Sequence, residues 1–131
     1  MLLSLIVLGA LALAGTASAS SLKMNATVSN GSYTLSYDSN IVVSKDVPNP
    51  QFTTAMTNQT GTTALCATHL VEANAWSAWV PVAPGQQATV TTGWGQGFPG
   101  TKLSQVTYEL WCNGTLQLTA VSKMTLTGQA G

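Results

Sequence analysis

Val106-Thr107-Tyr108-Glu109-Leu110-Trp111-Cys112 is the stretch of this sequence that decides the fold. Its β-branched and aromatic residues, with a period of two, predict a strand that is buried on one face. Asn113-Gly114 follows directly and is a strong signal for a two-residue hairpin turn into Leu116-Gln117-Leu118. The stretch therefore predicts a hairpin near the C-terminus.

The same alternation recurs between turn signals from Leu22 to the end of the chain, and no convincing amphipathic helix interrupts it. Ala75–Val80 is expected to be one strand, and Met124–Leu126 is expected to be the last. Gly93–Gly100 contains four glycines and one proline in eight residues, which predicts a loop. We therefore expect residues 22–131 to form a mainly β domain, an immunoglobulin-like antiparallel β-sandwich of about eight or nine strands.

Residues 1–21 form a separate apolar N-terminal segment. Its apolar run, Leu2–Ala14, covers about 13 residues, fewer than the ~20 of an ordinary membrane span. Ala17-Ser18-Ala19 resembles a signal-peptide cleavage site, although no basic residue precedes Lys23. If the segment is retained instead, we expect a helix that is apolar all round and needs a membrane or a bundle of identical helices. Both interpretations place the remainder outside the cell.

Two cysteines, Cys66 and Cys112, each lie within an expected strand. An even number of cysteines in a secreted chain predicts a disulfide. Trp76 and Trp79 follow the first cysteine, and a Cys…Trp…Cys order with a bridge between the two sheets is typical of immunoglobulin-like domains. Leu110 stands where those domains place a tyrosine, so the pattern predicts the architecture and not membership of the immunoglobulin family.

Charged residues make up only 6 % of the 131 residues, and the formal net charge is zero. Nucleic-acid binding requires a basic stripe, and four cations spread from Lys23 to Lys123 supply none. The 45 % share of hydrophobic residues also excludes a disordered chain, because such a sequence can bury a core. We therefore expect a folded domain with no nucleic-acid partner.

The acid and base groups are few: Asp38, Asp46, Glu72, Glu109 and His69. His69 and Glu72 are three residues apart in an expected strand, so their side chains should point to opposite faces. One histidine and two bridged cysteines cannot supply the three or four ligands of a transition-metal site. We expect no catalytic residues, no metal site and no cofactor.

Tryptophan is the residue type that most suggests binding. Trp94 lies in the glycine-rich loop, where we expect its ring to be exposed to a ligand or to another subunit. Trp76, Trp79 and Trp111 lie in or next to expected strands and are expected to be in the core. Because exposed rings can stack on sugars, a secreted carbohydrate-binding or adhesive β-sandwich module is the alternative function.

Four N-glycosylation sequons begin at Asn25, Asn30, Asn58 and Asn113. Asn30, Asn58 and Asn113 fall in expected turns, where the chain can carry a glycan. Glycans are therefore possible partners of this surface.

An apolar N-terminal segment followed at once by an uncharged β-sandwich rich in Thr, Ser, Asn and Gln resembles an archaeal type IV pilin without its basic leader. The resemblance implies apolar helices in a filament core, an immunoglobulin-like and often glycosylated domain facing outward, and only transient membrane contact through residues 1–21. It also implies an extracellular or cell-surface location and a homopolymer. The expected function is therefore a non-enzymatic structural subunit of a pilus-like filament or surface assembly. Assembly by lending the strand Leu22–Val28 to the next subunit also fits.

Overall fold

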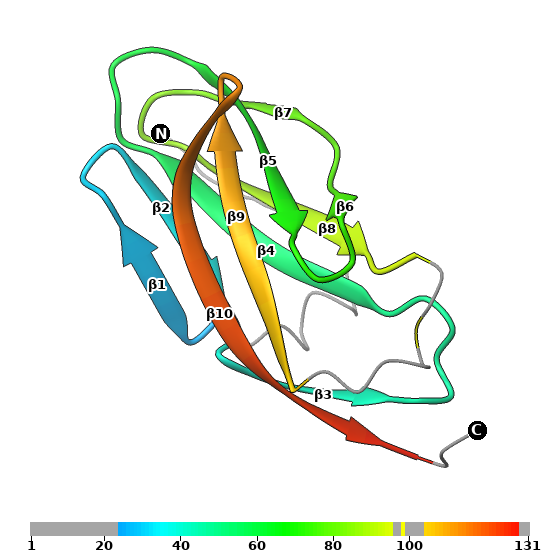
Figure 1. The fold of residues 1–131 in the computed structure, drawn as a ribbon. Helices are drawn as coiled ribbons and strands as arrows, with labels where there is room; N and C mark the ends of the chain where they lie inside the picture. Colours follow the sequence, from blue (N-terminus) through cyan, green and yellow to red (C-terminus); the bar gives the residue numbers. More distant parts are fainter. Residues whose placement is uncertain (1–23, 96–97, 99–103, 129–131) are drawn as a thin grey trace, which may run out of the picture.

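A computed structural model describes residues 24–95, 98 and 104–128, and these residues form an all-β domain of two sheets (Figure 1). The apolar segment 1–21, with its alternative interpretations as signal peptide or helix, lies outside the described residues. No helix in the described part of the chain is long and apolar enough to cross a membrane. The expected mainly β class is confirmed, with ten strands among the described residues.

The first sheet is antiparallel throughout, and its strands lie in the order β1 (Ala26–Ser29), β2 (Tyr33–Tyr37), β4 (Gln51–Asn58) and β8 (Gln87–Gly93). The predicted turn at Asn30-Gly31 joins β1 to β2. Gly31 has φ 91°, a left-handed conformation that glycine adopts without steric cost. Along β2, Tyr33, Leu35 and Tyr37 point into the core, so the period of two is met.

The second sheet has the order β3 (Asn40–Ser44), β10 (Thr115–Thr127), β9 (Gln105–Cys112), β5 (Ala64–Leu70) and β6 (Ala75–Trp76), and β7 (Val80–Val82) also pairs with β5. The expectation of a purely antiparallel sandwich is wrong at one edge, because β3 runs parallel to β10. Only Asp38 and Ser39 separate β2 from β3, so the chain passes straight from one sheet to the other. The direction of β3 is therefore set by β2 rather than by a hairpin with β10.

Two strand boundaries also differ from the expected ones. Leu116–Leu118 and Met124–Leu126 are not separate strands but belong to the long, curved strand β10, which has an irregularity between Leu116 and Leu118 (Figure 1). The segment Ala75–Val80 is divided into β6 and β7 by residues 77–79. This division places Trp79 in a connection rather than in a strand.

The core lies between the sheets and is mostly apolar. Its largest fully buried side chains include Leu35 and Met56 from the first sheet and Leu70, Tyr108 and Leu110 from the second. Full burial of such a side chain contributes about 1.5–3 kcal/mol to the hydrophobic stabilisation of the fold. Two of the buried polar groups pair with each other, in the 2.9 Å hydrogen bond between the hydroxyls of Thr54 and Thr68.

The disulfide between Cys66 and Cys112 is confirmed, but it does not join the two sheets. The two cysteines lie opposite each other on the neighbouring strands β5 and β9, with their Cα atoms 4.1 Å apart. Both are buried against the core. The expected inter-sheet bridge is therefore corrected to a bridge within the second sheet, because both cysteine-bearing strands belong to that sheet.

Candidate functional site

An aromatic cluster lies on the outward face of the second sheet, and we define it as His69, Trp76, Trp79 and Trp111. The expectation that the three tryptophans are in the core is wrong. Trp76 and Trp79 are 43 % and 42 % exposed, and Trp111 is partly exposed. Alternation explains Trp111, because its neighbour Cys112 faces the core and adjacent strand residues face opposite sides.

Trp76 is the ring that the other members of the aromatic cluster contact. It stacks on His69 with 4.3 Å between ring centroids and on Trp79 with 5.5 Å, and both pairs are close to parallel. Trp111 meets Trp76 edge-on at 5.6 Å. Ala67 is paired with Trp111 in the sheet and is fully buried, as expected for a small outward-facing residue under large rings. Aromatic pairs of this kind contribute about 0.5–1.5 kcal/mol beyond the area that they bury.

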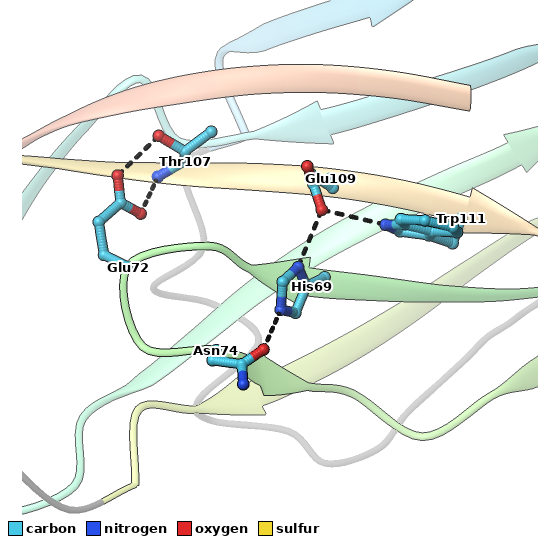
Figure 2. A network of polar contacts seen from close by, with 6 residues as sticks. All are labelled: His69, Glu72, Asn74, Thr107, Glu109 and Trp111. Atoms are coloured by element: carbon cyan, nitrogen blue, oxygen red, sulfur yellow. Dashed lines mark hydrogen bonds and ion pairs between the residues drawn. The ribbon is translucent and has the colours of Figure 1, made fainter. Parts of the chain in front are cut away.

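A chain of polar contacts joins two members of the aromatic cluster, Trp111 and His69, through Glu109 (Figure 2). Glu109 lies opposite His69 in the sheet, and one of its carboxylate oxygens, Oε1, is 2.9 Å from His69 Nδ1. The same oxygen accepts a hydrogen bond from Trp111 Nε1 at 3.1 Å, while His69 Nε2 is 2.8 Å from Asn74 Oδ1. The His69 contact is the main reason that the pKa of Glu109 is below its ordinary value; partial burial opposes this effect and the Trp111 N–H adds to it.

Glu72 belongs to a different network. Its carboxylate accepts hydrogen bonds from the backbone N–H and the hydroxyl of Thr107, both at 2.7 Å (Figure 2). His69 thus pairs with Glu109, a partner on another strand, and not with Glu72. Sequence spacing gave no sign of the Glu109 contact, because it depends on the register between β5 and β9. Among the described residues, no group of three or more His, Cys, Asp or Glu side chains could hold a metal ion.

Trp94 is not presented to solvent as expected. Its side chain is only 5 % exposed and packs against Phe52 and Phe98, with ring centroids 5.9 and 5.2 Å away. Its backbone N–H donates a hydrogen bond to the carbonyl of Pro50, so the chain continues the direction of β8 and the Trp94 side chain points inward, as the Thr92 side chain does. The exposed-ring role predicted for Trp94 is therefore corrected to a role in the core.

The four sequons differ sharply in accessibility. Asn58 is fully buried, and its Nδ2 donates hydrogen bonds to the carbonyls of Thr62 and Val82 at 2.7 and 2.8 Å. Its Oδ1 accepts hydrogen bonds from the N–H and the hydroxyl of Thr60. The folded domain has no room for a glycan on this nitrogen, so the prediction for Asn58 is corrected to a structural role.

Asn25, Asn30 and Asn113 are exposed. The Nδ2 atoms of Asn25 and Asn30 lie 3.4 Å from Asp38 Oδ1 and 3.2 Å from Gln117 Oε1, so both amides have side-chain partners. Asn113 sits at the turn between β9 and β10, close to the aromatic cluster in sequence. Its neighbours in the sheet include the exposed residues Leu65 and Leu116.

Exposed aliphatic residues extend the apolar character of this sheet face. Leu65 on β5, Leu116 and Val121 on β10, and Val42 on β3 are all large hydrophobic residues with high exposure. Exposed apolar patches mark interaction sites more often than scattered single residues do. Comparison with known protein families and with curated proteins finds no match for this chain.

Proposed function

We propose that the chain is a non-enzymatic structural subunit of an extracellular filament or cell-surface assembly, and that its partner is another copy of itself. The observation that carries the proposal is the absence of charge from the edge strands of both sheets. β1 and β8 are the edges of the first sheet, and β3 and the short strands β6 and β7 are at the edges of the second. None of these five strands contains Asp, Glu, Lys or Arg.

An unpaired edge is a template for pairing with another chain, and soluble monomers protect their edges with charges, prolines or bulges. Only β7 has such protection, in Pro81. β3 is an unprotected edge of this kind: among the described strands it pairs only with β10, and it carries Val42, which is 70 % exposed. Pairing of this edge with a different edge of the next copy would not close on itself and would produce a fibre.

Two further features support an extracellular assembly. The Cys66–Cys112 disulfide favours an oxidising compartment. The apolar segment 1–21, if it is retained, also needs partners that bury it. A pilin-like layout with an immunoglobulin-like outer domain is the arrangement that we propose for such a polymer.

The test is the state of association of the full 131-residue chain, examined by negative-stain electron microscopy and size-exclusion chromatography. We expect fibres, and we expect Val42→Lys to shorten or abolish them because the substitution places a charge on the open edge. Thr57→Lys is the matched control, because Thr57 is partly exposed on β4 and is paired on both sides, with Thr34 of β2 and with Gln87 of β8. A monodisperse monomer of the full chain in plain buffer would contradict the proposal.

A secreted carbohydrate-binding module is the second candidate, and the aromatic cluster favours it. The exposed Trp76 ring stacks on His69 and on the exposed Trp79 ring, and His69 contacts the Glu109 carboxylate and the Asn74 amide, which are groups that could bind sugar hydroxyls. Titration of tryptophan fluorescence with a panel of oligosaccharides tests this function. Saturable quenching that Trp79→Ala removes would favour it over self-assembly.

A further inference from the structure

We propose that Asn113 is an N-glycosylation site whose first sugar residues pack on the apolar rim formed by Leu65, Trp111 and Leu116. The proposal rests on the extracellular location in the proposed function but does not depend on polymer formation. The occupant of the apolar sheet face beside Asn113 is then a covalently attached carbohydrate.

The turn that carries Asn113 presents it to solvent in one defined conformation. Asn113 and Gly114 have φ values of 53° and 77°, so both adopt the left-handed conformation of a two-residue hairpin turn. Thr115 supplies the hydroxyl of the sequon and pairs with Cys112 across the hairpin. The disulfide beneath this turn holds β9 against β5.

Among the residues that the structure describes, the Asn113 side chain is held through its oxygen, and no partner contacts its nitrogen. Leu65 N–H donates a hydrogen bond to Asn113 Oδ1 at 2.9 Å, and Asn113 N–H donates one to the Leu65 carbonyl at 2.8 Å. Nδ2 is the atom to which a glycan is attached, and it is the other end of the same carboxamide. Asn113 thus differs from Asn58, whose Nδ2 donates two hydrogen bonds inside the fold.

Three apolar side chains surround this position. Trp111 is two residues before Asn113 and faces outward, and in the sheet it lies opposite Leu116. Leu65 lies opposite Asn113 and faces the same side as Ala67, which is the partner of Trp111 on β5. Leu65 and Leu116 are exposed, so the amide is next to apolar surface that water otherwise covers.

A pyranose ring suits this rim because one of its faces consists largely of C–H groups, while its hydroxyls point outward. Contact of the C–H face with the Trp111 indole and the two leucines removes apolar surface from water. The hydroxyls keep their hydrogen bonds to solvent. Attachment at Asn113 holds the sugar beside the rim, so the contact is intramolecular and has a high effective concentration.

The modification requires a lipid-linked sugar diphosphate and a transferase, which the cell supplies. A bond forms between Asn113 Nδ2 and the anomeric carbon of the sugar, and the bond from that carbon to the diphosphate oxygen breaks. The diphosphate leaves with the electron pair, and one amide proton is lost to a base. The Asn113 oxygen keeps its hydrogen bond to Leu65 N–H in the product.

The experiment uses the full chain, secreted from a eukaryotic cell line behind a cleavable host signal sequence. Glycopeptide mass spectrometry should find Asn113 occupied and Asn58 unmodified. Thr115→Val then removes the sequon without changing Asn113, and melting temperatures are compared with and without the glycan. We expect the glycan to raise the melting temperature by roughly 4–8 °C, the shift that a modest stabilising contact produces in a domain of this size.

A double-mutant cycle separates the rim contact from a general effect of glycosylation. In a Trp111→Ala background the glycan should give less than half of this rise, and Leu116→Ser provides the same comparison if the first variant does not fold. Ser32→Ala is the matched control for the loss of a glycan elsewhere on the surface. It removes the sequon of Asn30, which lies in the turn between β1 and β2 in the other sheet.

An unmodified Asn113, or an equal rise in both backgrounds, would overturn the proposal. Binding of free oligosaccharide to the chain without its glycan, with no coupling between the glycan and Trp111, would replace it with a site for external sugars. Electron microscopy of the secreted wild-type chain reports on polymer formation separately from glycopeptide analysis, so failure of this proposal is distinguishable from failure of the proposed function.

Discussion

Reduction of the Cys66–Cys112 disulfide should lower the free energy of unfolding by roughly 4 kcal/mol. The bridge spans 46 residues of sequence, and closing a loop of that length removes about this much conformational entropy from the unfolded chain. The native contacts around it should survive reduction, because the flanking pairs Ala67–Trp111 and Thr68–Leu110 hold β5 against β9 independently. The lower free energy of unfolding should therefore come from the greater conformational entropy of the unfolded chain and not from a change in the native fold.

Urea unfolding followed by tryptophan fluorescence, with and without reductant, measures this difference. For a slope of about 1–3 kcal/mol per molar urea, the midpoint should fall by roughly 1–4 M on reduction. A Cys66→Ala, Cys112→Ala double variant should unfold near the reduced wild-type chain and should not respond to reductant. Equal midpoints for the oxidised and reduced wild-type chains would refute the loop-entropy reasoning.

Three further predictions concern single side chains. Trp94→Ala should cost about 3–5 kcal/mol in urea unfolding because the ring is buried, whereas Trp79→Ala should cost about 1 kcal/mol; equal losses would contradict their different burial. Asn58→Ala should cost at least about 2 kcal/mol, since it removes the buried hydrogen bond to the Val82 carbonyl and the acceptor for Thr60, while Asn40→Ala at the surface should change stability by less than about 0.5 kcal/mol. The melting temperature should be nearly flat from pH 8 to about pH 5 and should fall only slightly at lower pH. The reason is the lowered pKa of Glu109: the ionised carboxylate stabilises the fold at a pH above its ordinary pKa, and this stability is lost as the carboxylate protonates. The partial exposure of Glu109 limits this contribution to less than about 1 kcal/mol, and Glu109→Gln should remove it. An unchanged pH profile would assign the acid dependence to another group.

The sequence predicts most strands because their period of two is clear. β2 and β9 follow the expected alternation, and the turns at Asn30-Gly31 and Asn113-Gly114 lie where the dipeptides predict them. Alternation assigns each residue to a face but does not identify the neighbouring strand. The parallel pairing of β3 with β10 and the bridge within one sheet were therefore beyond this kind of reasoning.

The candidate site was predictable in part. Cys112 is buried in its disulfide, and the period of two then places Trp111 on the outward face, so this position could have been read from the sequence. The exposure of Trp76 and Trp79 depends on the break between β6 and β7, which has no clear turn signal. The pairing of His69 with Glu109 depends on register between strands that are 40 residues apart in sequence. Contacts of this kind require the tertiary structure.

The edge strands and the apolar rim beside Asn113 are separate parts of the surface, with a second copy of the chain as the proposed partner of the first and a glycan as that of the second. In the described part of the chain, the edge strands have no charge to prevent pairing, and Leu65 and Leu116 beside Asn113 are exposed. A chain without its glycan would thus have two ways to associate, through its edges and through its face, and contacts through both favour irregular aggregates. A glycan on Asn113 would cover the rim of Leu65, Trp111 and Leu116 and leave β3 open. Ordered fibres should therefore form more readily from the glycosylated chain than from the Thr115→Val chain, and a Val42→Lys substitution should prevent fibres in both.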